Sequence, residues 1–281
     1  MLEKCACCFE ESIGEFMNID VLVSTMNIEN LTMYNELLKN LNIKGKSVVI
    51  NQCPTKNVKI DDITESDNRI YTFHEKGLSK SRNKAIEHST ADISLFADDD
   101  MRYVDDYEKI VKEAYKKFPD ADIVAFYVSS DNINNIKPRL KEGRINVFNS
   151  FKIQSVQLSI KTNIIKNKNI KFDEKFGTGA KLFMGEENIF LVDCLKSKLK
   201  IYSYPVEIAR LTNRESTWFK GYDSEYFQVK GACFSRISKY FWLLLFIQFI
   251  IRKRKEYTGS ITPLKALKNM MIGRRKYFEC I

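Results

Sequence analysis

The sequence is poor in histidine, and its cysteines are not spaced as a disulfide framework or a metal site. Seven cysteines and two histidines, His74 and His88, occur in 281 residues. Apart from those at positions 5, 7 and 8 the cysteines are isolated, and their number is odd. A disulfide scaffold is therefore not expected, and a reducing compartment is. No second Cys/His pair with ligand spacing exists, which argues against structural zinc.

Long apolar segments are missing as well. The longest, residues 240–251, has twelve residues with one polar member and is followed by Arg-Lys-Arg-Lys at 252–255. Twelve helical residues measure about 18 Å, against about 30 Å of bilayer hydrocarbon. The segment is expected either to pack as a core helix or to lie in a membrane interface, its basic neighbours on anionic headgroups. No signal peptide is readable, so a cytoplasmic protein is expected.

Several motifs and linkers are also absent. There is no GxxxxGK[ST] phosphate loop, no GxGxxG after the first predicted strand, no GxSxG and no HExxH. These absences exclude the common classes of nucleotide-binding site and of hydrolase active site. No stretch rich in Pro, Gly or Ser separates domains. One continuous domain is expected over residues 19–236, with an N-terminal extension at 1–18 and a C-terminal helical, membrane-associating tail at 237–281.

The composition is that of a globular protein with a sizeable core, 44% hydrophobic and 29% charged. The excess of 45 basic over 36 acidic residues gives a net charge of +9. It suits a polyanionic partner, or simply a solvated surface rich in lysine. A nucleic-acid binder needs a basic stripe interleaved with aromatics. The one dense basic run lies beside the apolar segment instead, so no nucleic-acid partner is expected.

Near-continuous apolar runs alternate with helix-like stretches. This pattern predicts an α/β fold with a mostly parallel central sheet covered by helices on both faces. In the second half, the strand predicted at 199–205 is expected to end at Pro205. The other predicted strands are 20–25, 47–51, 69–73, 92–97, 122–128 and 156–160, and the predicted helices are 30–41, 78–89, 104–118 and 186–198.

Three adjacent carboxylates, Asp98, Asp99 and Asp100, follow directly on the predicted strand at 92–97. In parallel sheets ligands bind beyond the carboxyl ends of the strands. Carboxylate oxygens are what hard divalent cations such as Mg²⁺ or Mn²⁺ prefer. The alternative is a solvated loop that caps the next helix.

A second candidate place is "KGLSKSRNKAI" at 76–86. Gly77 permits a turn, a serine can cap the helix, and Lys80 and Arg82 add positive charge at a helix N-terminus. This fits a phosphate site or an ordinary capped surface helix.

The third place is "GTGAKLFMGEENIF" at 177–190, where a Gly-rich approach leads to Glu186 and Glu187. Acids in a first helical turn are favoured by the helix dipole. A carboxylate presented in this way can equally serve as a general base.

In their order and spacing these places resemble the family 2 glycosyltransferases with the GT-A fold, in particular bacterial capsule and lipopolysaccharide transferases. The resemblance covers roughly residues 18–236 and implies the GT-A architecture. The segments that carry it are "VLVSTMN" (21–27), "GLSKSRN" (77–83), "ADDD" (97–100), "GEEN" (185–188) and "STWFKGY" (216–222).

The resemblance implies inverting transfer of a hexosyl or N-acetylhexosaminyl group from a nucleotide-diphosphate sugar, most often a UDP-sugar, to a hydroxyl of a glycan or lipid-linked acceptor. It makes Glu187 the general base. Asp100 and Asp98 become ligands of Mn²⁺ or Mg²⁺, which neutralises charge on the leaving diphosphate. The residues that it implies for nucleotide-sugar binding are Ser24, Thr25, Asn27, Gln52, Lys80, Arg82, Asp98, Asp99, Glu186, Trp218 and Lys220.

Two positions depart from the family pattern. The second strand usually ends in an acidic pair that reads the base, and here it ends in Asn51 and Gln52. An amide oxygen can still accept a hydrogen bond from uracil N3–H. The base position holds Glu187 instead of the commoner Asp, so the longer side chain requires a slightly retracted backbone.

Two functions are alternatives to glycosyl transfer. A sugar-1-phosphate nucleotidyltransferase needs a Gly-rich basic loop after the first strand, and "STMNIEN" (24–30) is not one. A non-catalytic GT-A-like scaffold of a membrane polysaccharide assembly complex stays open. The expected partners are the sugar donor, the acceptor and the inner leaflet of the cytoplasmic membrane, to which the protein would bind peripherally.

Overall fold

The computed structural model describes residues 17–55, 60–64, 66–130, 138–212 and 221–279. The chain forms two compact units. The first comprises Met1–Lys76, Lys80–Lys171 and Cys194–Arg214, and the second comprises Gly77–Ser79, Phe172–Asp193 and Glu215–Ile281. The predicted boundary between a domain at 19–236 and a tail at 237–281 stays a prediction. The two compact units have different boundaries from these.

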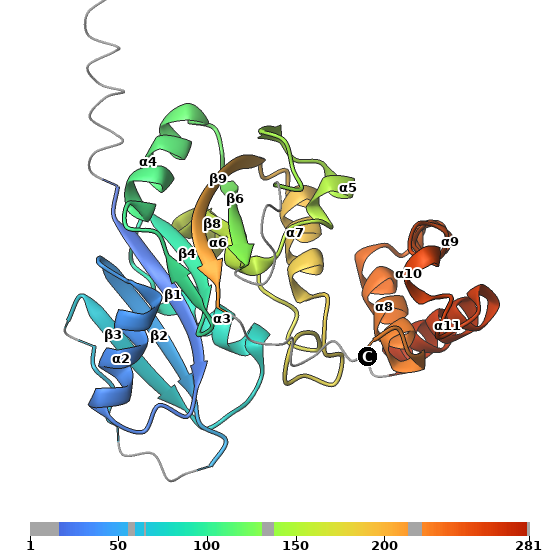
Figure 1. The fold of residues 1–281 in the computed structure, drawn as a ribbon, viewed down its shortest axis with the longest axis horizontal. Coiled ribbons are helices and arrows are strands. Elements are labelled where there is room, and N and C mark those ends of the chain that lie inside the picture. The colour runs from blue at the N-terminus through green and yellow to red at the C-terminus, as the bar shows by residue number, and fades with distance from the viewer. Residues whose placement is uncertain (1–16, 56–59, 65, 131–137, 213–220, 280–281) are drawn as a thin grey trace, which may run out of the picture. The chain divides into compact units, whose positions relative to one another are not determined.

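The first unit is built on a nine-stranded sheet in the order β3-β2-β1-β4-β8-β6-β9-β5, with β7 paired to β9 (Figure 1). Strands β3, β2, β1 and β4 are parallel to one another. β8 runs antiparallel to β4 and β6, β6 is parallel to β9, and β5 and β7 are antiparallel to β9. The bounds are β1 Ile19–Met26, β2 Lys46–Gln52, β3 Asn68–Phe73, β4 Ile93–Asp98, β5 Met101–Tyr103, β6 Ile123–Ser130, β7 Gly143–Arg144, β8 Leu158–Lys161 and β9 Ile201–Leu211.

Helices cover both faces of this sheet. Val21 of β1 and Leu95 of β4 lie in one buried cluster with Leu37 of α2 and Val111 of α4. Alternate residues such as Phe96 point to the other face and are buried too, as predicted for a sheet covered on both sides. The helices that precede β9 in the sequence are α2 Leu31–Leu41, α3 Leu78–His88, α4 Tyr107–Lys117, α5 Val147–Ser150, a 3₁₀ helix Ser155–Gln157, α6 Thr162–Asn167 and α7 Glu186–Lys196, and most of α7 belongs to the second unit.

The prediction that Pro205 ends the last strand is wrong. β9 continues to Leu211, and its register with β6 shifts where Ala125 pairs with Ser203 and Tyr127 with Glu207. The additional residues of β9 form a bulge there. A proline lacks the N–H that a regular ladder needs, and a bulge accommodates it without loss of the strand.

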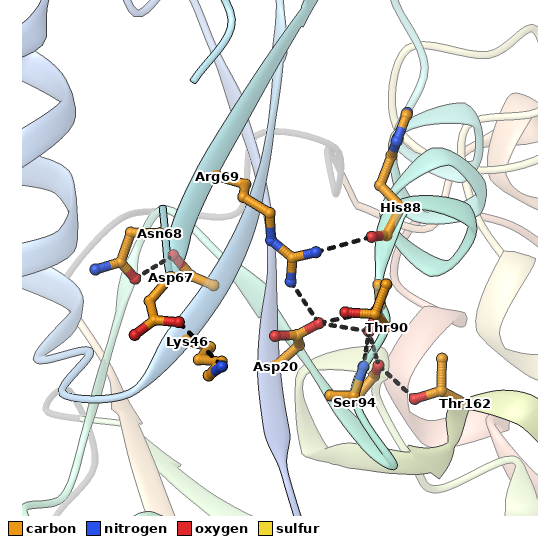
Figure 2. Close-up of polar contacts among 12 residues, drawn as sticks. Asp20, Lys46, Asp67, Asn68, Arg69, His88, Thr90, Ser94 and Thr162 are labelled. Carbon is orange, nitrogen blue, oxygen red and sulfur yellow. Dashed lines mark hydrogen bonds and ion pairs between the residues drawn. The ribbon is translucent and has the colours of Figure 1, made fainter. Parts of the chain in front are cut away.

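A buried polar network closes the amino-terminal edge of the parallel strands (Figure 2). Asp20 of β1 is fully buried, and its Oδ2 accepts hydrogen bonds from Arg69 Nη2 at 2.8 Å, Ser89 Oγ at 2.7 Å and Thr90 N at 3.3 Å. Arg69 also donates to the carbonyl oxygen of His88 at 3.1 Å. The network joins β1 and β3 to the end of α3.

The second unit consists of α8 Ser224–Ile237, α9 Trp242–Arg252, α10 Arg254–Tyr257 and α11 Pro263–Glu279, with the start of α7. Helices α8 and α11 pack very closely, since a Cβ on Gly273 would lie 1.8 Å from the carbonyl oxygen of Gln228. Phe249 of α9 contacts Phe234 and Phe227 of α8 edge to face. In the part of the chain that the structure describes, every helix is too short or too polar to cross a membrane.

Candidate functional site

The carboxyl ends of β1, β2 and β4 meet at one edge of the first unit. β1 lies between the other two, with Ser24 opposite Asp98 and Met26 opposite Gln52. The structure therefore brings together three predicted groups, residues 24–27, 51–52 and 98–100, that are far apart in the sequence. This follows from the strand order, in which β1 is central.

Arg82 of α3 holds the first aspartate. Its side chain is buried, 2% exposed, and its Nη2 donates to Oδ1 of Asp98 at 2.9 Å and to Oδ2 at 3.3 Å. The Asp98 side chain is 32% exposed. Direct contact of Arg82 with a nucleotide stays a prediction, and in the described structure the guanidinium is buried and bonded to Asp98. Its position is suited to orienting that carboxylate.

The acidic turn is also held by β1 and by the end of β9. Thr25 Oγ1 donates to Asp99 Oδ2 at 3.0 Å. The carbonyl oxygen of Asp100 accepts hydrogen bonds from Thr212 N and Thr212 Oγ1, both at 2.8 Å. Sequence reasoning missed Thr212, which lies 112 positions away and carries no local signal. The turn is thus fixed by contacts that only the sheet provides.

The carboxylates suit a divalent cation that shares its coordination shell with a ligand. Among the described residues, no group of three or more His, Cys, Asp and Glu side chains is placed to hold a metal. Mg²⁺ usually takes only one or two protein carboxylates together with phosphate oxygens and water. That Asp100 and Asp98 hold such a cation stays a prediction, and Asp98 would share its oxygens with Arg82.

Asn51 has a structural task. Its Oδ1 accepts a hydrogen bond from Ile28 N at 2.9 Å, and its Nδ2 donates to Ile28 O at 2.8 Å. These bonds fix the loop after β1, where Asn27 adopts the left-handed region at φ 58° and donates its N–H to Gln52 O at 3.2 Å. Asparagine tolerates that region better than most residues. Gln52, the other amide of the pair, is buried as well, at 3% exposed.

The other predicted residues of the α3 region are placed as follows. Ser81 Oγ donates to Ser24 Oγ at 2.8 Å, which ties α3 to the end of β1. Lys80 Nζ lies 3.7 Å from Oε2 of Glu75, and Lys84 Nζ lies 3.6 Å from Oε1 of the same residue. Glu75 thus offsets part of the positive charge that the sequence predicts for this helix start.

The second unit contains the predicted base. Gly185, with φ of 98°, precedes α7, and a Cβ there would lie 2.6 Å from Cys233 Sγ, so glycine is required. Glu186 is buried and Glu187 half-buried, with Asn188 Nδ2 3.4 Å from Glu187 Oε1. Burial raises the pKa of the Cys233 thiol to about 12, so it stays protonated and is unsuited to act as a nucleophile.

The loop before α7 is tied to the first turn of α3 within this unit. Ser79 Oγ donates to the carbonyl oxygen of Phe176 at 2.6 Å, and Leu78 N donates to Thr178 O at 2.9 Å. Arg236 of α8 forms ion pairs with Asp173 and with Asp193 of α7, each at 2.8 Å. Trp218 and Lys220, expected to close over the ligand, lie outside the described residues.

Comparisons with known proteins agree with this architecture. The model of glycosyl transferase family 2 matches residues 47–180, which include Gln52, Lys80, Arg82 and the acidic turn but not Glu187. No curated protein matches the chain.

Among solved structures, the chain is similar to S. aureus TarS 1–349 in complex with UDP, with a TM-score of 0.58 and 12% identity over 94% of this chain and 92% of that one. The complex of TarS 1–349 with UDP-GlcNAc gives a TM-score of 0.55 and 11% identity over the same shares. Likenesses at this identity show the fold alone. Residues 47–180 are therefore similar to glycosyl transferase family 2, in a chain with the GT-A fold.

Proposed function

We propose that the protein is an inverting glycosyltransferase that moves a hexosyl or N-acetylhexosaminyl group from a UDP-sugar to an acceptor hydroxyl. The observation that carries the proposal is the acidic turn 98–100, held by Arg82, Thr25 and Thr212 at the sheet edge where β1 and β2 also end. The match to family 2 supports sugar transfer. The titles of the similar TarS structures, which name UDP and UDP-GlcNAc, support the choice of donor.

On the donor side, the residues at the ends of the parallel strands recognise the nucleotide. Ser24, Thr25 and Asn27 line the end of β1, and the Gln52 amide accepts the hydrogen bond from uracil N3–H. Lys80 adds positive charge toward the diphosphate. Arg82 acts as a positioning residue through Asp98.

Asp100, with Asp98, would hold Mn²⁺ or Mg²⁺. When bound, the cation neutralises negative charge on the departing diphosphate. Asp99, oriented by Thr25, would accept hydrogen bonds from hydroxyls of the donor. The protein's own contribution is to hold the carboxylates of Asp98 and Asp99 and the backbone of Asp100 in place before the ligand arrives, which lowers the reorganisation needed during reaction.

Glu187 would act as the general base. It takes the proton from the acceptor hydroxyl while the acceptor oxygen forms a bond to the anomeric carbon and the bond from that carbon to the diphosphate oxygen breaks. Glu186 would contact donor or acceptor hydroxyls. Base catalysis of this kind contributes about 10²–10⁴-fold. Trp218 and Lys220 are proposed to cover the sugar and diphosphate.

The acceptor is proposed to be a glycan or a lipid-linked molecule, and the site of action the inner surface of the cytoplasmic membrane. The apolar and basic tail supports this location. A non-catalytic scaffold of the same fold is the competing function. The geometry of the acidic turn favours the enzyme, because a scaffold has no need for three carboxylates held together against their mutual repulsion.

Calorimetric titration with UDP, GDP, CDP and dTDP, with and without Mn²⁺, tests the proposal. Wild type is expected to bind UDP in a metal-dependent manner, and Asp100→Asn to lose that binding. Asp67→Asn is the matched control, since Asp67 is an exposed aspartate that pairs with Lys46 at the opposite, amino-terminal end of β2. Absence of nucleotide binding in wild type with metal present would contradict the donor site.

Glu187→Gln separates enzyme from scaffold. The variant is expected to keep UDP binding and to lose turnover of the donor with membrane extracts as the acceptor source. Unchanged turnover in this variant would remove Glu187 from the mechanism.

A further inference from the structure

The positive charge of the chain is concentrated in its last 44 residues. Residues 238–281 contain ten Lys and Arg and two acidic residues, whereas the preceding 237 residues carry 35 basic and 34 acidic. Nearly all of the net charge of +9 therefore lies in this segment. Of its ten cations, only Lys253 and Arg275 form salt bridges within the described residues, with Glu256 and Glu279. Arg274 contacts aromatic rings and Lys276 donates to Gln228 Oε1, and the other six cations form no salt bridge with the described residues.

Helix α9 of this segment is buried on one side only. Phe246, Phe249 and Ile250 are buried and face the rest of the second unit. On the opposite side a continuous apolar face is exposed, with Leu244 at 62% and Ile251 at 69%. The spacing of the exposed residues is that of one face of a helix. The members of this face are Tyr240, Phe241, Leu243, Leu244, Ile247 and Ile251.

The amino-terminal end of the face is aromatic and is fixed to α11. The guanidinium carbon of Arg274 lies 4.2 Å from the ring centroid of Trp242 and 4.8 Å from that of Phe278, so the cation contacts both rings. Trp242 in turn packs edge to face on Phe246. The carboxyl-terminal end of the face is basic, with Arg252 exposed there and Lys255 beyond it.

We propose that the α9 face, defined as the six exposed apolar residues at 240–251, docks the protein on an anionic phospholipid bilayer. With 11 residues α9 measures about 16 Å, so it lies in the interface and does not span the hydrocarbon. Aromatic residues favour the headgroup level, and the cations beside them contact the lipid phosphates. The proposal specifies the surface that underlies the membrane location proposed above and does not depend on sugar transfer.

A second copy of the chain fits this surface less well. Lys239 precedes the α9 face and the cluster 252–255 follows it, so both ends of the helix are positive. A symmetric pairing of two α9 helices would place cations next to cations, parallel or antiparallel. A bilayer with anionic headgroups offers negative charge to both positive ends of α9.

Co-sedimentation of the full chain with vesicles tests the proposal. The vesicles are phosphatidylcholine alone and equal parts of phosphatidylcholine and phosphatidylglycerol. Wild type is expected to bind the anionic vesicles and to be released as salt rises, since screening weakens the cation contacts. Leu244→Asp is expected to weaken binding about tenfold or more, and Lys255→Glu about fivefold or more.

Matched controls are Leu31→Asp and Lys116→Glu, exposed residues of the first unit that lie outside the α9 face and are expected to leave vesicle binding unchanged. Calorimetric binding of UDP, measured on the same samples, keeps this test separate from that of the donor site. Equal vesicle binding by wild type and Leu244→Asp would overturn the proposal. A wild-type dimer in light scattering that Leu244→Asp dissociates, with no vesicle binding, would overturn it in favour of a second copy.

Discussion

Two Arg–Asp pairs lie at opposite ends of the same parallel strands, and they are built in opposite ways. In the Asp20–Arg69 pair, with N–O distance 2.8 Å, the carboxylate is 1% exposed and the arginine 12%. In the Asp98–Arg82 pair, with distance 2.9 Å, the arginine is 2% exposed and the carboxylate 32%. The two N–O distances are nearly the same, but the more exposed partner is the arginine in the first pair and the carboxylate in the second.

The difference shows what each pair is for. Asp20 is enclosed by the hydroxyl of Ser89 and the N–H of Thr90, which join strands and helix and leave no room for a ligand. Asp98 lies partly exposed at a sheet edge, next to Asp99 and Asp100 in the sequence. Its partner Arg82 is buried. A buried ion pair is weak support for stability in itself. What distinguishes the two is which partner faces outward.

The largest expected effect is the loss of stability when the buried Asp20–Arg69 pair is broken. Asp20→Asn leaves the Arg69 charge without its partner, and we expect the free energy of unfolding to fall by about 3–5 kcal/mol. Adding Arg69→Met removes the stranded charge and should recover most of that loss. Denaturant unfolding measures both. A double variant as unstable as the single one would show that the pair itself contributes net stability.

The second prediction concerns the Asp98–Arg82 pair at the sheet edge. Asp98→Asn with Arg82→Met removes both charges together, so stability should change far less than in Asp20→Asn. Metal-dependent UDP affinity should fall about 10–100-fold, because a residue that orients metal ligands is lost. Asp20→Asn with Arg69→Met is the matched control and should bind UDP as wild type does. Unchanged affinity in the Asp98 double variant would make both pairs structural.

A smaller effect is expected from single hydroxyl groups in the two regions. Thr25→Val removes the hydrogen bond to Asp99 and should weaken UDP binding by about 1 kcal/mol, or about fivefold. Thr162→Val removes the contact with Ser94 Oγ, 2.8 Å away in the Asp20 region, and should lower stability by about 1 kcal/mol without affecting UDP. Titration calorimetry and denaturant unfolding on both variants check the contrast. If Thr162→Val weakened UDP binding instead, the two regions would be coupled.

The smallest predicted effect is a pH dependence on the Asp20 side. His88 stacks on Tyr71 with ring centroids 3.9 Å apart, and burial lowers the pKa of His88 below its usual 6.5. Between that lowered pKa and 6.5 the unfolded chain binds more protons than the folded one, so stability should fall as the pH drops below about 6.5. His88→Phe keeps the stacking and should remove this part of the pH dependence. Unfolding curves at several pH values test it, and an unaltered dependence in the variant would exclude His88 as its source.

Much of the fold was predictable because its signals are local. Every strand predicted from an apolar run is present, and β1, β2, β3, β4 and β6 agree with the predicted ranges to within two residues. The short strands β5 and β7 were missed, since three and two residues are too few for a periodicity. The prediction that the last strand ends at Pro205 was wrong for a related reason. Local chemistry says that proline interrupts a ladder, but it does not say that a bulge opposite Tyr127 will absorb the interruption.

The roles of the candidate site residues stay predictions, but part of their arrangement could be predicted from the sequence. The acidic turn and the residues at the ends of β1 and β2 were singled out from the sequence and do lie together. The burial of Arg82, the use of Asn51 to hold Ile28, and the contacts of Thr212 with the Asp100 carbonyl oxygen were not foreseen. Each of these depends on a partner brought near by strand order and not by sequence spacing.

By itself, the sequence determined the alternation of strands and helices, the acidic turn at a strand end, and a basic, apolar tail, because apolar periodicity, turn chemistry and charge act over a few neighbouring residues. Only the tertiary structure decided which partner of each Arg–Asp pair faces outward and which side of α9 stays exposed. In the two Arg–Asp pairs the contacts join residues 16 and 49 positions apart. The free energy of such a contact appears only once the sheet has placed both partners.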